Sequence, residues 1–284
     1  MKQIHSIDEV RAAISAWREV GDTVALVPTM GNLHKGHISL AKLAAEYAEH
    51  VVVSVFVNPT QFGPNEDFDA YPRTLAADAR KLSHAGMDIM FAPSVKEIYP
   101  RGLDNGTQVL VPGLSDQLCG AARPGHFAGV TSVVCRLLNI CAPDVAVFGQ
   151  KDYQQWIILR KMVADLHSPV RLVAGPTMRE KSGLAMSSRN SLLDDAQRDK
   201  AASIFSALIG VEQQLQAGRR DYAKLEDEAA GHIRDAGLET EYVAIRRSLD
   251  LGMPEKDTPR LSVLAAARLD KVRLIDNVLV ELSQ

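Results

Sequence analysis

The sequence predicts an α/β protein, with a Rossmann-like, doubly wound parallel sheet in its N-terminal part and a smaller α+β domain after it. Up to about residue 177, short unbroken apolar runs alternate with helical patterns, which is typical of parallel strands covered on both faces. Beyond that point, two helical segments precede three strand-like runs, an order that favours an α+β domain. We therefore expect one domain over 1–178 and a second over 179–284.

The first domain is expected to contain five strands and four helices in alternation. The strands are predicted from apolar runs at 23–29, 51–57, 88–93, 144–149 and 170–177. The helices are predicted at 37–50, 74–86, 129–144 and 152–166. In sheets of this kind, ligands bind beyond the carboxyl ends of the strands, so the polar residues that follow the strands are the ones to inspect.

The second domain begins with a helix signal. Asp194 followed by Gln197 resembles a capping box and predicts one long helix that ends at Gly218. A second helix is expected over 221–236. Three strands are then predicted, at 239–247, 260–269 and 272–282.

Composition excludes several classes of function. The 284 residues carry a net charge of -3, which argues against a broad surface for nucleic acid or anionic membrane. No apolar run reaches the ~20 residues of a spanning helix, and the N-terminus resembles neither a secretory signal nor a transit peptide. The 3 cysteines lack C-x-x-C spacing, so we expect reduced packing residues in a cytoplasmic protein.

The stretch "VPTMGNLHKGH" (27–37) turns an apolar strand abruptly into a glycine loop with two histidines. Gly31 permits a tight turn, and His34 and His37 flank the start of the next helix. Free backbone N–H groups and the helix dipole favour anions there, so the residues predict a phosphate site. Two surface histidines are the plain alternative. A metal pair is another, although no third ligand with suitable spacing is evident nearby.

A second polar stretch, "VFGQKDYQQ" (147–155), also follows a strand. Lys151 at the start of a helix can reach phosphate oxygens, and Asp152 can hold a ribose hydroxyl or a metal ion. Gln155 lies one helical turn along and should project towards the same cleft. The alternative is an ordinary solvated helix start.

The stretch "GLAMSSRNSLL" (183–193) is predicted to be a flexible loop. It offers Ser187, Ser188 and Arg189 as donors to phosphates. A serine-rich linker between domains would have a similar composition.

Neutral polar groups follow the second strand, in "FVNPTQFGPNEDFDAYPRT" (56–74). Asn58 and Gln61 suit a small substrate with hydroxyl and carboxylate groups better than a phosphate chain. Turn chemistry at Asn-Pro is the alternative.

These four stretches, together with "RPGHFAGVTSVV" (123–134), resemble the pantothenate synthetase (pantoate–β-alanine ligase) family over nearly the whole chain. The H-x-G-H motif alone is shared with the wider nucleotidyltransferase superfamily. The resemblance implies a ligase in which the pantoate carboxylate attacks the α-phosphate of ATP and releases pyrophosphate. The amine of β-alanine then attacks the pantoyl adenylate and displaces AMP. It also implies Mg²⁺ with ATP, a homodimer, a cytoplasmic location and a C-terminal domain that covers the ATP site.

The resemblance also implies roles for single residues. His34 and His37 would hold the phosphates and the leaving pyrophosphate, with His37 as a proton donor, while Lys151 and Arg189 would neutralise charge. Pantoate would contact Gln61, Gln155 and Asn58, with Gln61 also near β-alanine, and no residue is predicted as a direct metal ligand. The residues implied to bind ATP are Met30, Gly31, Asn32, Leu33, His34, Lys35, Gly36, His37, Gly149, Gln150, Lys151, Asp152, Met178, Met186, Ser187, Ser188 and Arg189.

The sequence departs from the family pattern at Gln150, where the family often has glutamate, so contacts to ribose or metal near this position are less defined. Two other functions stay open. A nucleotidyltransferase for a phosphorylated metabolite would need cations at the acceptor, whereas this chain has Asn58, Gln61 and Gln155. A non-catalytic nucleotide sensor could use the same phosphate site.

Overall fold

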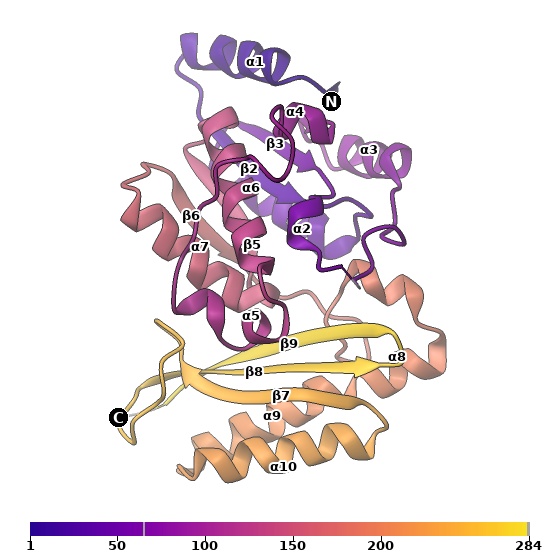
Figure 1. The fold of residues 1–284 in the computed structure, drawn as a ribbon, viewed down its shortest axis with the longest axis vertical. Coiled ribbons are helices and arrows are strands. Elements are labelled where there is room, and N and C mark those ends of the chain that lie inside the picture. The colour runs from indigo at the N-terminus through magenta and orange to yellow at the C-terminus, as the bar shows by residue number, and fades with distance from the viewer. Residues whose placement is uncertain (65, 283–284) are drawn as a thin grey trace.

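The computed structural model describes residues 1–64 and 66–282, and within them the N-terminal part is built on a parallel sheet of 6 strands (Figure 1). Their order across the sheet is β1-β4-β3-β2-β5-β6, and every neighbouring pair is parallel. The strands are β1 (Lys2–Ile4), β2 (Val24–Thr29), β3 (His50–Val55), β4 (Ile89–Phe91), β5 (Val145–Gly149) and β6 (Arg171–Gly175).

Helices cover both faces of this sheet, which is why its strands are apolar without alternation. Along β2, Val24 and Leu26 join the core formed with α1 (Ile7–Glu19), α6 (His126–Cys141) and α7 (Tyr153–Asp165). Ala25 and Val27 point to the other face, where they join the core beneath α2 (Lys35–Ala44) and α3 (Leu75–His84). The doubly wound arrangement that the sequence predicts is confirmed.

Strand β2 occupies the point where the strand order reverses, because it pairs with β3 on one side and with β5 on the other. The loops that follow β2 and β5 therefore diverge and leave a crevice at the carboxyl ends of these strands. The first predicted histidine stretch and the "FGQKD" stretch both lie there. Short helices complete this part: α4 (Val95–Ile98), α5 (Cys119–Ala122), and the 3-10 turns η1 (Pro59–Gln61), η2 (Leu114–Asp116) and η3 (Gln150–Asp152).

The C-terminal part is a separate antiparallel sheet backed by helices (Figure 1). Its strands are β7 (Glu239–Arg247), β8 (Arg260–Leu269) and β9 (Val272–Glu281), paired in that order. One face packs on α9 (Ser203–Gln216) and α10 (Tyr222–Asp235) in an apolar core of its own. The other face is turned towards the N-terminal sheet, so β8 and β9 stand opposite the crevice.

Four local predictions need correction. Strand β1 is an additional strand that the sequence did not predict. The helix expected over 37–50 ends at Ala44, because the chain must turn before β3 begins at His50. The capping box at Asp194 is present, but it opens a short helix, α8 (Asp195–Ala201), and α9 starts after Ala202. The chain keeps helical angles there, with φ −63° and ψ −18°, so the two helices meet without a loop.

The fourth correction concerns the serine-rich stretch. The expected flexible loop is the 3-10 helix η4 (Ser188–Leu192), with Ser188 and Asn190 buried. The Ser187 hydroxyl accepts a hydrogen bond from the backbone N–H of Arg189 and so caps this turn. In the described part of the chain, helices are too short or too polar to cross a bilayer.

Candidate active site

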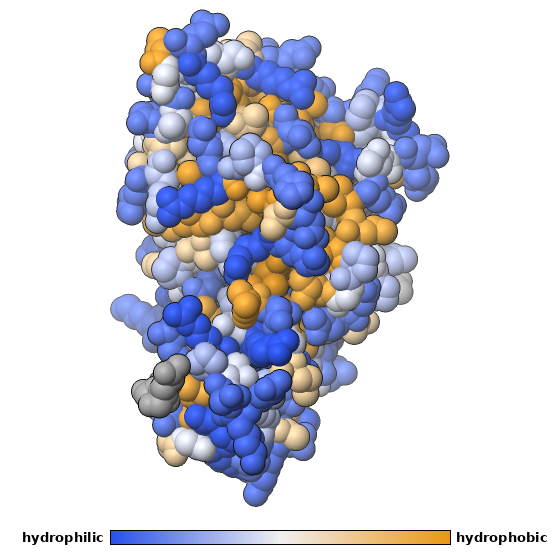
Figure 2. All heavy atoms as spheres, turned by 90° about the vertical axis from the view of Figure 1, so that its left-hand side faces the viewer, coloured by the Kyte–Doolittle hydropathy of each residue, from blue (hydrophilic) through white to orange (hydrophobic). Residues whose placement is uncertain are grey.

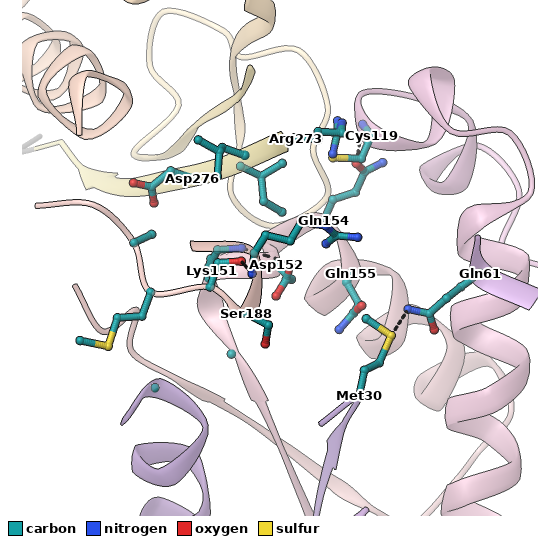
Figure 3. A pocket seen from close by; sticks show the side chains of 18 of the residues that line it. Met30, Gln61, Cys119, Lys151, Asp152, Gln154, Gln155, Ser188, Arg273 and Asp276 are labelled. Carbon is teal, nitrogen blue, oxygen red and sulfur yellow. Dashed lines mark hydrogen bonds and ion pairs between the residues drawn. The ribbon is translucent and has the colours of Figure 1, made fainter. Parts of the chain in front are cut away.

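A cavity of about 920 Å³ lies where the carboxyl ends of β2 and β5 face the C-terminal sheet (Figure 3). All four polar stretches found in the sequence contribute to its wall, and β8 and β9 close the opposite side. The predicted residues that line it are Met30, His34, Gly36, His37, Asn58, Gln61, Gly149, Lys151, Asp152, Gln155, Met178, Met186, Ser187, Ser188 and Arg189.

The loop between β2 and α2 is shaped by a buried carboxylate. Gly31 has a φ of +83°, which glycine adopts without strain. The next two backbone N–H groups, of Asn32 and Leu33, donate to Asp78 of α3 over 2.9 and 2.8 Å. Because Asp78 is fully buried, these bonds set the path of the loop that leads into α2.

The two histidines cap the helix that they begin. The Nδ1 atom of His34, the N-cap residue, accepts from the backbone N–H of Gly36 over 3.1 Å. The Nδ1 atom of His37 accepts from the backbone N–H of His34 over 3.3 Å. In a neutral imidazole the proton then lies on Nε2, so each ring keeps an Nε2–H donor for a ligand in the cavity.

Burial keeps both imidazoles neutral. Desolvation, followed by the nearby charge of Lys151, lowers the pKa of His34 from 6.5 to about 4. Desolvation, followed by the proximity of His34, lowers the pKa of His37 to about 3. At neutral pH both histidines therefore offer hydrogen bonds without a positive charge.

Lys151 supplies a positive charge next to these rings. It lies in η3, just beyond β5, with its Nζ 3.8 Å from Oδ1 of Asp152. The side chain of Asn277, from β9, donates to the backbone carbonyls of Gln150 and Lys151 over 3.0 and 2.8 Å. The C-terminal sheet thus holds the turn that carries Lys151.

The η4 turn is tied to the histidine loop. The hydroxyl of Ser188 donates to the carbonyl of Asn32 over 3.1 Å, and the Asn32 amide donates back to the carbonyl of Ser188 over 3.2 Å. Arg189 forms a two-point ion pair with Asp67, with both distances 2.9 Å. The arginine predicted to bind phosphate is thus paired with a carboxylate.

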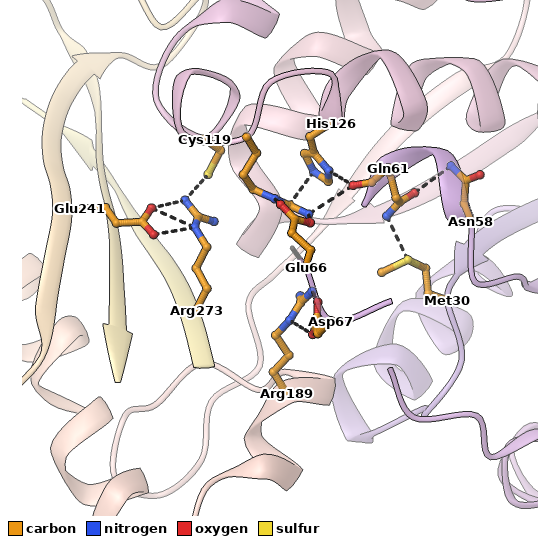
Figure 4. Close-up of polar contacts among 11 residues, drawn as sticks. Met30, Asn58, Gln61, Glu66, Asp67, Cys119, His126, Arg189, Glu241 and Arg273 are labelled. Carbon is orange, nitrogen blue, oxygen red and sulfur yellow. Dashed lines mark hydrogen bonds and ion pairs between the residues drawn. The ribbon is translucent and has the colours of Figure 1, made fainter. Parts of the chain in front are cut away.

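Glutamines occupy the other end of the cavity. The amide of Gln61 donates to Sδ of Met30 over 2.9 Å and accepts from Asn58 over 3.2 Å (Figure 4). Asn58 is 1% exposed and also donates to the carbonyl of Gly129, so it fixes the side chain of Gln61 from the buried side. The side chain of Gln155 points towards Met30 and Gln61 across this space (Figure 3).

Some predicted residues lie off the cavity wall. These are Gly31, Asn32, Leu33, Lys35 and Gln150. The first three shape the loop through their backbone. The half-buried Gln150 contributes its carbonyl to Asn277, and its side chain does not line the cavity.

Sequence reasoning missed several polar residues of the wall, among them His126 and Arg123. His126 Nδ1 donates to the carbonyl of Gln61 over 2.7 Å, and its Nε2 accepts from Arg123 over 3.0 Å. Desolvation and then the charge of Arg123 lower the pKa of His126 to about 4. Arg123 in turn pairs with Glu66 over 2.7 Å. The "RPGH" stretch was the available signal, because it contains both residues.

The C-terminal strands contribute charged residues for which no local sequence signal exists. Arg273 of β9 pairs with Glu241 of β7 over 2.8 Å and approaches the thiol of Cys119 (Figure 4). Asp276 of β9 accepts a two-point ion pair from Arg179. In the described part of the chain, no three or more histidine, cysteine, aspartate or glutamate residues gather as metal ligands would.

Comparison with known proteins shows which family the whole chain resembles. A family model described as pantoate-beta-alanine ligase matches residues 2–279. The pantothenate synthetase of Stutzerimonas stutzeri is 51% identical over 282 residues, which is 99% of each chain. The pantothenate synthetase of Methylococcus capsulatus is 49% identical over 99% of each chain.

Solved structures agree. The crystal structure of pantothenate synthetase from Thermus thermophilus matches with a TM-score of 0.92 and 41% identity, covering 98% of this chain and 99% of that one. The pantoate-beta-alanine ligase of Francisella tularensis, complexed with beta-gamma ATP and beta-alanine, matches with a TM-score of 0.82 and 34% identity. That match covers 98% of this chain and 97% of the Francisella chain.

Proposed function

Because the chain belongs to the pantoate–β-alanine ligase family, we propose that it condenses (R)-pantoate with β-alanine and cleaves ATP to AMP and pyrophosphate. One observation carries this proposal for the site. Two neutral imidazole donors and Lys151 line one part of the cavity, and the uncharged amides of Gln61 and Gln155 line another, where the charge of the neighbouring Arg123 is paired with Glu66. The first part suits phosphates, and the second suits an acceptor without a phosphate.

In the first step, a carboxylate oxygen of pantoate attacks the α-phosphorus of ATP, and the bond from that phosphorus to the bridging oxygen of pyrophosphate breaks. The Nε2–H groups of His34 and His37 donate to the phosphate oxygens, and Lys151 neutralises the charge that builds on the leaving group. These donors are fixed by the helix cap before ATP arrives, so little reorganisation is required during the reaction. Gln61 and Gln155 hold pantoate in line for attack.

In the second step, the amine of β-alanine attacks the acyl carbon of pantoyl adenylate. The new C–N bond forms, AMP leaves with the electrons of the acyl–oxygen bond, and the amine gives up a proton to solvent. The chemistry requires no nucleophile from the protein. It does require that water be kept from the adenylate, and the sheet of β7, β8 and β9 covers that side of the cavity.

We also propose that ATP enters with Mg²⁺. The ion would be held mainly by the phosphates, where it would neutralise part of their charge. Asp152, whose side chain is 48% exposed at the cavity wall, is the carboxylate that would face it or the ribose.

The division into domains 1–178 and 179–284 is part of the same proposal, with the second domain as a cover for the ATP site. The main apolar cores lie on opposite sides of this boundary and support it, and one small cluster of Tyr153, Ile157, Leu251 and Leu264 joins the two sides. The contact from Asn277 to the Lys151 turn would link closure to the phosphate site.

We further propose a cytoplasmic homodimer. The free cysteines Cys119, Cys135 and Cys141 fit a reducing compartment. Figure 2 views the molecule from the side on which β6 and α7 lie, and apolar residues gather across the middle of this face. Such a face would suit a second copy of the chain. Light scattering on the purified protein would test the dimer, and a mass of one chain, 30.9 kDa, would contradict it.

The decisive experiment measures AMP formation by purified protein supplied with ATP, magnesium, pantoate and β-alanine, with each component omitted in turn. We expect AMP only with the complete set. His37→Ala should lower the rate by about 100-fold or more, because a fixed donor to the phosphates is lost. His84→Ala, which changes an exposed histidine of α3, is the matched control and should be as active as the wild type.

Other outcomes would point to other functions. Continued pyrophosphate release over many turnovers with an acceptor but without any amine would indicate a nucleotidyltransferase, because the proposed ligase releases only a single equivalent per site before it needs β-alanine. ATP binding without any turnover would indicate a sensor. Either result would overturn the ligase assignment.

A further inference from the structure

Arg189 is engaged on one edge of its guanidinium. Its Nε and Nη2 atoms donate to the two carboxylate oxygens of Asp67, each over 2.9 Å (Figure 4). Its Cζ atom lies over the ring of Tyr71, 5.7 Å from the ring centroid. The Arg189 side chain is only 25% exposed. A largely buried guanidinium without a partner would be costly, and the pair with Asp67 removes that cost.

Asp67 is not shielded from the cavity by Arg189. It lines the cavity itself, together with His34, His37 and Lys151, the groups that favour phosphate. Burial would raise the pKa of its carboxyl, but hydrogen bonds and the charge of Arg189 outweigh this and lower the pKa. The site therefore holds a negative charge where the proposed substrate brings several more.

We propose that Asp67 is an internal counter-ion of Arg189 that the phosphates of ATP displace, so that the strength of the Asp67–Arg189 pair sets the affinity for ATP. The inference rests on the proposed function, because it takes ATP as the incoming anion. Carboxylate and phosphate both fit the two-point fork of a guanidinium, so one can replace the other on the same edge.

A different arrangement would leave Asp67 in place, with Nη1 of Arg189 turned to the phosphates and Asp67 acting only to position it. The placement of Asp67 favours exchange, because a retained carboxylate in the cavity wall would repel the phosphates. The two arrangements predict opposite effects of removing the charge. If Asp67 competes with the phosphates for Arg189, removal of its charge makes ATP bind more tightly. If Asp67 only positions Arg189, the same change makes ATP bind more weakly.

The test compares Asp67→Asn with Glu66→Gln. Both changes remove one negative charge at adjacent positions, and Glu66 pairs with Arg123 instead of Arg189. Calorimetric titration with ATP, without pantoate, gives the dissociation constant independently of turnover. Adenosine is the second probe, because it lacks phosphates.

We expect Asp67→Asn to tighten ATP binding about 3- to 5-fold, the upper part of the range for one partly exposed ion pair. Adenosine binding should change less than about 2-fold, and so should ATP binding to Glu66→Gln. Asp67→Ala should tighten ATP binding in the same direction, and thermal unfolding checks that each variant is folded.

Weaker or unchanged ATP binding in both Asp67 variants would overturn the inference, as would equal tightening in Glu66→Gln. If the wild type forms AMP from the full substrate set while these results appear, only the inference fails. If the wild type fails to bind ATP, the proposed function and the inference fail together.

Discussion

His37 and His34 combine two tasks that depend on the same proton. Each uses Nδ1 as the acceptor that caps α2, which leaves the proton on Nε2. A protonated ring would lose the cap, since both nitrogens would then be donors. The low pKa values of these histidines are therefore linked to the stability of the helix start as well as to phosphate binding.

This linkage predicts how stability depends on pH. The folded-state pKa of His37, about 3, lies below its unfolded value of 6.5, so the unfolded chain takes up a proton first as the pH falls. The contribution of His37 is complete above pH 6.5 and is lost progressively towards pH 3. Between neutral pH and pH 5, we expect the free energy of unfolding to fall by about 2 kcal/mol from this residue.

Urea unfolding at the two pH values provides the measurement. His37→Asn, which keeps a hydrogen-bond acceptor but cannot titrate, should reduce the fall, while the exposed His84→Asn should leave it as in the wild type. An identical pH dependence in His37→Asn and wild type would refute the linkage.

At the scale of elements, α6 is pressed directly against the η1 turn. A Cβ added at Gly129 of α6 would lie 2.3 Å from the carbonyl oxygen of Thr60 and 2.7 Å from Cα of Gln61. Both neighbours are backbone atoms, which cannot rotate away. The glycine therefore allows the close approach that places Gln61 at the cavity wall.

Gly129→Ala should lower the free energy of unfolding by about 3 kcal/mol, because the helix and η1 must separate. It should also raise KM for pantoate if Gln61 binds that substrate. Gly210→Ala is the matched control, since Gly210 lies within α9 and an added Cβ would meet nothing within 4 Å.

The control should be more stable than the wild type by about 0.5–1 kcal/mol, because alanine favours a helix over glycine. Chemical denaturation measures both variants. Equal effects of the two substitutions would mean that the contact between α6 and η1 has no special role.

At the scale of the whole molecule, the C-terminal sheet takes part in building the phosphate site. Asn277 of β9, 2% exposed, is the link, since it donates to two consecutive carbonyls of η3. Its replacement would leave those carbonyls without their partner and free the turn that carries Lys151.

We expect Asn277→Ala to lower kcat/KM for ATP by about 10- to 100-fold through misplacement of Lys151, with KM for pantoate little changed. Asn139→Ala, in which the lost side-chain bond lies within α6, is the control and should keep wild-type kinetics. Steady-state kinetics with each substrate varied distinguishes the outcomes. An equal fall in kcat/KM for both substrates, with both KM values unchanged, would indicate loss of folded enzyme instead of loss of this link.

Local sequence determined a large part of this protein. Apolar runs and helix signals are short-range features, so five of the six parallel strands, the C-terminal strands and the capping box at Asp194 could be predicted. The position of His34 before α2 and of His37 in its first turn followed from the same local rules. Parallel strands bring their carboxyl ends to one edge, which is why the polar stretches after three of these strands could be assigned to one site, while the stretch 183–193 was linked to them by the family resemblance.

Only the tertiary structure decided which partners hold the functional groups. Asp78 shapes the histidine loop from 45 residues away, Asp67 pairs with Arg189 across 122 residues, and Asn277 reaches Lys151 across 126. Nothing near these residues in sequence marks them, because an aspartate or asparagine on its own is typical of any surface. The low pKa values of the histidines arose in the same way, from burial by chain segments that meet only in the folded molecule.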